Sequence, residues 1–339
     1  MSSADYSEAD VPGESAEGVV RVSAQGAKGE RLDRFLAQRL AGTPAAASRS
    51  RIQRWIALGA VVCDDRPVSA STRLAGFETL AVTPLPDEAD SAFEPDPVPL
   101  TIVHRSPDLL VIDKPAGLVV HPAAGNWRNT LLNGLLHLDP CFARLPRAGI
   151  VHRLDKDTSG LMVVAASERA AAALAAQLAD RTMSRRYLAF VHGTPPDAGC
   201  VDAPIGRDPS MRLRMAVVEG AAGKPARTHF RRLAAAQAQG GPIALLECRL
   251  DTGRTHQIRV HLSSIGHPIV GDELYGGRRE AIGRQALHAW RLGLVDPEGG
   301  NAVHWRSAPP ADMARLARSV GIDAGELCAR LDREIGDAR

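Results

Sequence analysis

The 339-residue sequence contains no run of about 18 apolar residues, the length that a membrane-spanning helix needs. Its amino terminus also lacks the basic start and hydrophobic stretch of a secretory signal. Hydrophobic residues make up 45% of the chain and charged residues 24%, the balance of an ordinary globular protein. We therefore expect a folded cytoplasmic protein with no membrane partner.

Metal and nucleotide motifs are missing as well. The five cysteines are odd in number and widely scattered, which is typical of reduced thiols rather than of a disulfide framework or a zinc ribbon. Neither HExxH nor a paired CxxC occurs, and His256 and His261 are spaced so that they share no face of a strand or a helix. Phosphate-cradling loops and G-x-G-x-x-G turns are absent. We predict no metal and no cofactor.

Basic residues are absent from the first part of the chain and concentrated in the next. Residues 1–20 contain five acidic side chains and no Lys or Arg, whereas residues 31–76 contain eight arginines and three aspartates, a net charge of +5. The first segment is rich in Ser, Glu, Gly and Ala, and such a composition buries too little apolar surface to fold. We predict a disordered acidic tail over residues 1–28, followed by a compact basic segment.

Two helices and a small sheet are expected over residues 29–83. Apolar residues recur there at helical spacing in two stretches, Leu32, Phe35, Leu36 and Leu40, then Ile52, Trp55 and Ile56. Ser48 or Ser50 can cap the second helix, and Gly59 can end it. Extended runs at residues 60–63 and 79–82 follow. Arg51 and Arg54, three residues apart, form a small basic face.

A second, larger domain is expected over residues 100–339. Residues 84–99 hold five prolines and five acidic residues, which predicts a stiff linker. Beyond them lie apolar runs typical of buried strands, at residues 109–112, 161–165, 188–191, 245–248 and 258–262. An Ala-rich helix over residues 168–181 can be capped by Ser167. Strands that do not alternate regularly with helices predict an α+β fold with a large, mostly antiparallel sheet.

Two polar segments between apolar runs are candidate sites. Residues 152–160 read as a polar turn between strands, which collects ionisable groups where a rigid sheet would hold them. Asp155 and Asp157 both fit a catalytic carboxylate there, although either could instead cap the turn. The spacing does not choose between them.

The other polar segment covers residues 252–262. If it is a strand, Thr255, Gln257, Arg259 and His261 share one polar face, and the apolar residues between them share the other. Arg259 could pair with a catalytic carboxylate and keep it ionised, or it could belong to a structural salt bridge.

Together these segments resemble the RluA family of pseudouridine synthases. His152-Arg153-Leu154-Asp155-Lys156-Asp157-Thr158-Ser159-Gly160 and residues 253–261 match that family's signatures, with support from residues 113–122, 186–189 and 266–272. Residues 31–36 and 48–56 resemble an S4 RNA-binding domain. Residues 223–226 and 284–289 are most similar to the RluD-like branch, whose members modify a stem-loop of large-subunit ribosomal RNA. The resemblance implies a pseudouridine synthase fold preceded by a small S4 domain.

The resemblance also implies residue roles. Asp155 would be the catalytic carboxylate, Arg259 its partner, and Tyr187 the residue that stacks near the uracil and accepts a proton. Arg153 corresponds to the arginine that fills the space vacated by the target base. Further RNA contacts are expected from the S4 helices and from a basic loop, through Arg49, Arg51, Arg54, Arg212, Arg214 and Lys224. The loop could also be an ordinary solvated hairpin.

The implied activity is isomerisation of specific uridines to pseudouridine in 23S ribosomal RNA, free or in a pre-ribosomal particle, by a monomer. The reaction moves the ribose bond from nitrogen to carbon and needs no redox partner. Asp155 could attack the sugar carbon or assist elimination, and the sequence does not choose between these routes. Other readings are a synthase for other rRNA or tRNA sites, an S4-type RNA-binding protein without catalysis, and a nucleoside hydrolase that releases free base.

Overall fold

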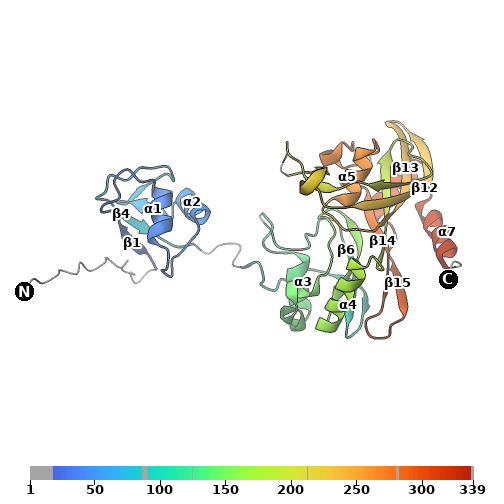
Figure 1. Cartoon of the computed structure of the whole chain (residues 1–339), viewed down its shortest axis with the longest axis horizontal. Coiled ribbons are helices and arrows are strands. Elements are labelled where there is room, and N and C mark those ends of the chain that lie inside the picture. The colour runs from blue at the N-terminus through green and yellow to red at the C-terminus, as the bar shows by residue number, and fades with distance from the viewer. Residues whose placement is uncertain (1–17, 86–90, 124, 212, 280–281, 337–339) are drawn as a thin grey trace, which may run out of the picture. The chain divides into compact units, whose positions relative to one another are not determined.

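The computed structural model describes residues 18–85, 91–123, 125–211, 213–279 and 282–336. The chain divides into two compact units, Met1–Asp90 and Ser91–Arg339 (Figure 1). Within the described ranges, no helix is both long enough and apolar enough to cross a membrane.

The N-terminal unit packs two helices on a small sheet, as expected. The described part of this unit has a four-stranded antiparallel sheet in the order β1-β4-β2-β3, and its elements are β1 (Val20–Ser23), α1 (Leu32–Arg39), α2 (Arg49–Ala57), β2 (Val61–Cys63), β3 (Arg66–Pro67) and β4 (Thr79–Val82). The Ser48 hydroxyl caps α2 by accepting the Arg51 N–H at 3.3 Å. Leu36, Ile52 and Leu80 are fully buried in one core.

The predicted tail over residues 1–28 extends too far. Residues 1–17 lie outside the described residues, but Val20–Ser23 forms strand β1, paired antiparallel with β4. Val20 and Val22 are buried while Arg21 between them is exposed. This alternation covers only four residues, too few to stand out beside the acidic composition that precedes it.

The predicted linker over residues 84–99 is also too long. Residues 86–90 lie outside the described residues, whereas residues 91–99 belong to the C-terminal unit. The Asn133 amide donates to the carbonyls of Ala92 and Glu94 at 2.9 and 2.8 Å. Asp96 is buried and pairs with Arg128. Composition predicts an extended backbone here, but it does not reveal that the backbone packs against a helix.

The C-terminal unit is built around one large sheet. Its described strands form a nine-stranded sheet in the order β5-β6-β7-β14-β8-β13-β12-β9, with β15 added to β14. Of the pairings in these ranges, β7 with β14 is parallel and the others are antiparallel, which confirms the predicted α+β fold. The strands are β5 (Thr101–Arg105), β6 (Leu109–Lys114), β7 (Ser159–Ala165), β8 (Ser184–His192), β9 (Ala198–Asp202), β12 (Arg227–Ala238), β13 (Gly241–Leu250), β14 (Leu287–Val295) and β15 (Ala302–Arg306). A separate ribbon pairs β10 (Ile205–Arg207) with β11 (Met215–Val217).

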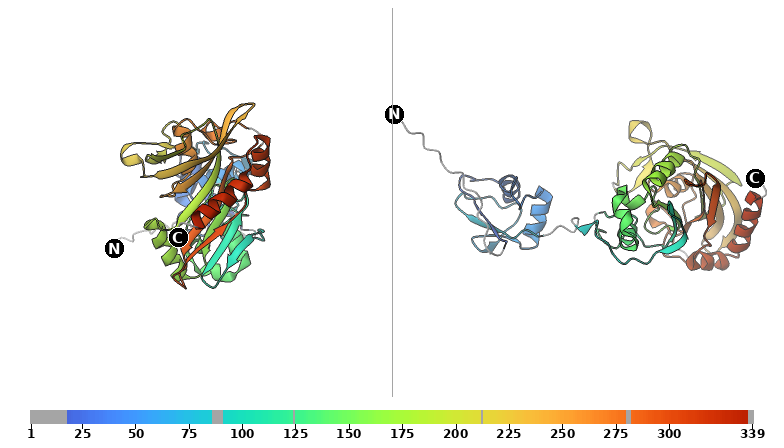
Figure 2. Two further views of the ribbon diagram at one scale, coloured as in Figure 1. Left: turned by 90° about the vertical axis from the view of Figure 1, so that its right-hand side faces the viewer. Right: turned by 90° about the horizontal axis from the view of Figure 1, so that it is seen from below.

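Both faces of this sheet carry a hydrophobic core. Along β6, Leu110 and Ile112 join the larger core while Leu109 and Val111 join the smaller one, as strand periodicity requires. Ser167 caps α4 as predicted, and α4 covers the smaller core. The C-terminal helices pack on the larger core (Figure 2). The helices are α3 (Leu131–Leu138), α4 (Glu168–Ala179), α6 (Ala311–Ser319) and α7 (Ala324–Gly336), with short 3-10 turns η2 (Pro140–Arg144), η3 (Pro146–Gly149), η4 (Gly220–Ala222) and η5 (Glu273–Tyr275).

The strand expected over residues 258–262 is wrong. This segment lies in helix α5 (Gln257–Ser264), which begins after His256 in a left-handed conformation with φ 56°. Residues 257–262 are all buried, so polar and apolar side chains alike face protein. A short apolar run that is buried on every side carries no helical periodicity, and its sequence cannot be distinguished from that of a strand.

Candidate active site

Two long basic side chains, Lys114 and Arg284, donate hydrogen bonds to backbone carbonyls of the turn that carries Asp155. The Lys114 ammonium is almost fully buried and donates to the carbonyls of Pro115, Leu118 and Lys156 at 2.8, 3.0 and 3.0 Å. Burial lowers the pKa of Lys114 to about 7. Arg284 donates to the Asp157 carbonyl at 2.9 Å. Hydrogen bonds to the Lys156 and Asp157 carbonyls therefore fix the two residues that follow Asp155.

Close backbone packing fixes the end of the same turn. Gly160 has φ +114°, and a Cβ at this position would lie 2.3 Å from the Ala289 carbonyl oxygen. Any side chain would force apart β7 and β14, which pair in parallel at this point. A glycine is thus required where the turn enters the central sheet.

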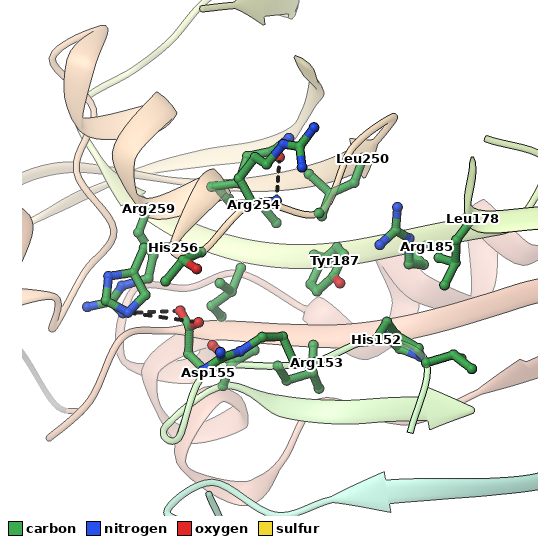
Figure 3. A pocket seen from close by; sticks show the side chains of 18 of the residues that line it. His152, Arg153, Asp155, Leu178, Arg185, Tyr187, Leu250, Arg254, His256 and Arg259 are labelled. Atoms are coloured by element: carbon green, nitrogen blue, oxygen red, sulfur yellow. Dashed lines mark hydrogen bonds and ion pairs between the residues drawn. The ribbon is translucent and has the colours of Figure 1, made fainter. Parts of the chain in front are cut away.

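Arg259 links two carboxylates in the site. It donates through Nη1 to Asp155 at 3.1 Å, and through Nε and Nη2 to Asp272 at 2.7 and 2.9 Å. Burial opposes the charge of Arg259, but the hydrogen bonds and charge of Asp272, together with the charge of Asp155, outweigh it and raise the pKa of Arg259. The bidentate pair with Asp272 orients the guanidinium so that Nη1 points to Asp155 (Figure 3).

This geometry distinguishes the two aspartates that spacing alone could not, and it favours Asp155, as the family resemblance implies. Asp155 lines the cavity and contacts Arg259, whereas Asp157 does neither and instead gives its carbonyl to Arg284. The Asp155 side chain is 16% exposed, so it is shielded but still reachable.

His256 and Tyr275 complete this end of the site. His256 Nδ1 lies 2.8 Å from the Tyr275 hydroxyl, and His256 Nε2 lies 4.0 Å from Asp155 Oδ1. Burial lowers the pKa of His256 more than the charge of Asp155 raises it, so the ring is neutral near pH 7. The Arg259 guanidinium lies 4.9 Å from the centre of the Tyr275 ring. The aromatic ring therefore packs beside the arginine that holds both carboxylates.

Tyr187 lies in the middle of a cavity of about 330 Å³ (Figure 3). It comes from β8, its side chain is buried, and burial raises the pKa of its hydroxyl, which keeps the ring a neutral phenol near pH 7. Asp155 and Arg259 lie at one end of the cavity, while His152 and Arg185 lie at the other.

The cavity is strongly basic. Among the described residues that line it, Asp155 is the one acidic side chain, against five arginines, Arg147, Arg153, Arg185, Arg254 and Arg259. Arg153 is exposed, one position away from the buried Leu154. Such a cavity favours an anionic ligand with an uncharged part that reaches Asp155.

The three arginines predicted on helix α2 have different surroundings. Arg49 donates to the buried Asp33 at 2.9 Å, so it is engaged within the unit. Arg51 lies 5.5 Å from the Trp55 ring centre and donates to the Leu85 carbonyl at 3.3 Å. Arg54 is exposed. The basic face predicted for Arg51 and Arg54 is therefore carried mainly by Arg54.

The predicted basic loop lies near the ribbon of β10 and β11. Arg212 lies outside the described residues. Arg214 pairs with Asp208 at 3.1 Å and lies 5.6 Å from the Tyr275 ring centre. Lys224 is exposed, and its backbone pairs with Ile205. Through Tyr275, Arg214 is connected to the side chains around Arg259.

Sequence reasoning gave no role to several residues that shape this site. Asp272 ends the segment 266–272, which carried part of the family resemblance, but only the fold brings it to Arg259. Lys114 occurs in another such segment, 113–122. Arg185 stands two positions before Tyr187 on the same strand, and side chains at this spacing share one face. This spacing from Tyr187 was the sequence feature that could have placed Arg185 at the site.

Several known proteins are similar to this chain over most of its length. Residues 108–264 match the family model described as RNA pseudouridylate synthase. The ribosomal large subunit pseudouridine synthase D of Nitrosomonas europaea is 48% identical over 301 residues, covering 86% of this chain and 85% of that protein. The enzyme of the same name from Escherichia coli O6:H1 is 43% identical over 317 residues, covering 88% and 93%.

Solved structures show the same relationship. Human RNA pseudouridylate synthase domain containing 1 superposes with a TM-score of 0.54 at 27% identity, covering 70% of this chain and 96% of that one. Human RNA pseudouridylate synthase domain containing 4 gives a TM-score of 0.52 at 26% identity, covering 66% and 94%. The chain therefore belongs to the RluA family of RNA pseudouridine synthases.

Proposed function

We propose that this enzyme converts specific uridines of 23S ribosomal RNA to pseudouridine, with Asp155 as the catalytic carboxylate. The observation that carries the proposal is a single carboxylate, fixed by Arg259, in a cavity lined by arginines. The relatives named as ribosomal large subunit pseudouridine synthases support the choice of RNA. We infer that the enzyme acts as a cytoplasmic monomer on free rRNA or on a pre-ribosomal particle.

Asp155 opens the reaction by helping the ribose release the uracil nitrogen. It does so either by attack at the sugar carbon or by assisting elimination, and the ionised carboxylate serves both routes. The hydrogen bond from Arg259 holds the carboxylate in position for either route. Tyr187 stacks near the uracil as the base turns. Because its phenol is neutral, it takes the proton that leaves C5 as a relay, passing its own hydroxyl proton to solvent in the cavity.

The target base must leave its helix to reach Asp155, which costs a few kcal/mol. Arg153 is placed to offset part of this cost, because it is exposed at the cavity and precedes Asp155 by two residues. Its guanidinium can occupy the space that the base vacates and stack on the neighbouring bases.

The N-terminal unit acts as an S4-type RNA-binding domain in this proposal. Arg54 and the exposed Arg34 supply charge for phosphate contacts, while Arg49 links α2 to α1 through Asp33 and Arg51 contacts the Leu85 carbonyl. In the C-terminal unit, Arg214 and Lys224 contact the RNA backbone near the cavity. Substituting both Arg34 and Arg54 by Gln should weaken RNA binding and reduce its salt dependence. An unaltered salt slope would argue against this domain's role.

The decisive experiment compares two aspartates of one turn. Asp155→Asn should abolish pseudouridine formation in a 23S rRNA transcript, by a factor of about 1,000 or more, because the nucleophile or base is removed. Its dissociation constant for the RNA should change by less than about threefold, because the phosphate contacts remain. Asp157→Asn is the matched control and should retain most of the activity. Equal activity of both variants would exclude Asp155 from the reaction.

The product separates this function from the alternatives. An isomerase retains the base in the RNA, whereas a nucleoside hydrolase releases free uracil and an RNA-binding protein changes nothing. Mapping of pseudouridines in 23S rRNA from cells with and without this chain identifies the positions. Modification that is confined to tRNA or to other rRNA would instead support a different substrate.

A further inference from the structure

Buried polar atoms gather at the end of the cavity away from Asp155. Arg185 is 7% exposed, and its Nε has no hydrogen-bond partner among the described residues. His152 Nδ1 is also buried without a partner in that part of the chain. Both residues line the cavity, and Figure 3 shows them together beyond Tyr187. Buried polar groups are normally paired, so this end of the cavity lacks an acceptor.

His152 is a donor whose proton position is fixed. The Val163 N–H donates to His152 Nε2 at 3.1 Å, which leaves the ring proton of the neutral imidazole on Nδ1. Burial and then the charge of Arg185 lower the pKa of His152 to about 3, so the ring stays neutral. Arg185 itself remains charged because a guanidinium is not deprotonated in proteins.

Among the described residues, no carboxylate balances the charge of Arg185. No described carboxylate forms an ion pair with it, and Asp155, the one acidic residue of the cavity wall, pairs with Arg259. A buried cation without a partner is unfavourable, and a bound anion would offset that cost. Gly253 keeps the space beside the guanidinium open, because a Cβ there would lie 2.8 Å from Arg185 Nη1.

We propose that Arg185 and His152 form a phosphate subsite, which binds a phosphodiester of the RNA strand next to the target uridine. The inference rests on the proposed function, since a phosphate reaches this end of the cavity as part of the bound RNA. A guanidinium and a neutral N–H donor suit phosphate oxygens. The subsite anchors the strand at one end of the cavity while Asp155 acts on the ribose at the other.

The test measures RNA binding and turnover with a 23S rRNA transcript. Arg185→Gln should raise KM about tenfold, keep kcat within about threefold, and reduce the slope of log Kd against log salt concentration by about 1. Arg185→Lys keeps the charge and should retain most of the slope. Arg318→Gln, an exposed site on α6 outside the cavity wall, controls for the loss of one positive charge and should match the wild type.

The outcomes separate a ligand role from a structural one. Unfolding temperatures of the variants show whether they fold. If Arg185→Gln keeps the wild-type salt slope but loses kcat, Arg185 positions Tyr187 and the subsite is refuted. The subsite is also refuted if Arg185→Gln folds and leaves both the salt slope and KM at their wild-type values. If the wild type itself forms no pseudouridine in the transcript, the proposed function fails, whereas wild-type activity with an unaffected variant rejects the subsite alone.

Discussion

Each unit of this protein contains a cluster of arginines and carboxylates. The N-terminal cluster has two arginines around one carboxylate, and the C-terminal cluster has one arginine between two carboxylates. In the N-terminal unit a single buried carboxylate, Asp33, accepts hydrogen bonds from Arg31, Arg49 and Gln53. In the C-terminal unit the buried Arg259 donates to two carboxylates, Asp155 and Asp272. The first arrangement surrounds an anion, and the second distributes one cation between two anions.

The two clusters differ in how many carboxylate oxygens are already hydrogen-bonded. Both oxygens of Asp33 accept from arginines, and these bonds, that of Arg31 being the strongest, hold the pKa of Asp33 far below its usual value. Asp155 accepts from Arg259 through Oδ2, while Oδ1 lies 4.0 Å from His256 Nε2, beyond hydrogen-bonding distance. Asp155 therefore keeps an oxygen available to a substrate, whereas the acceptors of Asp33 are already used.

The strongest test of this comparison removes the central arginine. Arg259→Gln should lower the free energy of unfolding by about 3–5 kcal/mol, because Asp272, only 2% exposed, becomes a buried charge without its partner. Pseudouridine formation should also be lost. Denaturant unfolding and a turnover assay measure the two effects.

The double variant Arg259→Gln with Asp272→Asn distinguishes these effects. It should recover much of the stability, because the unpaired buried charge is gone, and it should remain inactive, because Asp155 is no longer held. Full activity in the double variant would show that Arg259 serves the fold alone.

A smaller effect is expected at the N-terminal cluster. Asp33→Asn should destabilise the N-terminal unit by about 1.5–3 kcal/mol, the range for hydrogen bonds to a charged group, since the half-exposed arginines can turn to water. The kcat should be unchanged, because Asp33 lies outside the catalytic unit. Asp65→Asn, at an exposed turn with φ 60° that Asn tolerates, is the control. A stable Asp33→Asn variant would mean that the cluster is not structural.

The smallest expected effect is the pH dependence of that difference. The folded pKa of Asp33 is lower than the unfolded value of about 3.9, so its contribution is complete above about pH 4 and is lost as the pH falls toward the folded pKa. Unfolding curves of the wild type and Asp33→Asn should therefore converge in acid. A difference that stays constant down to pH 2 would contradict the assignment.

Local patterns predicted much of the secondary structure. The helices of the N-terminal unit, the Ser167 cap of α4 and four of the five buried strands were visible as periodic or apolar runs. Each of these is decided by residues close together in the chain. The fifth run is helix α5 because a segment buried on every side shows no helical period in its sequence, and β1 was missed because its alternation covers only four residues.

By itself the sequence determined the two-unit organisation, the large sheet and the presence of a polar turn that contains two aspartates. Residues along one turn or strand follow from local periodicity, and the family resemblance rests on such stretches. Tertiary structure decided which aspartate faces the cavity, that Asp272 orients Arg259, and that Arg185 Nε and His152 Nδ1 are buried with no acceptor among the described residues. These relationships join residues up to about a hundred positions apart, and the free energy of pairing and burial depends on distances in space.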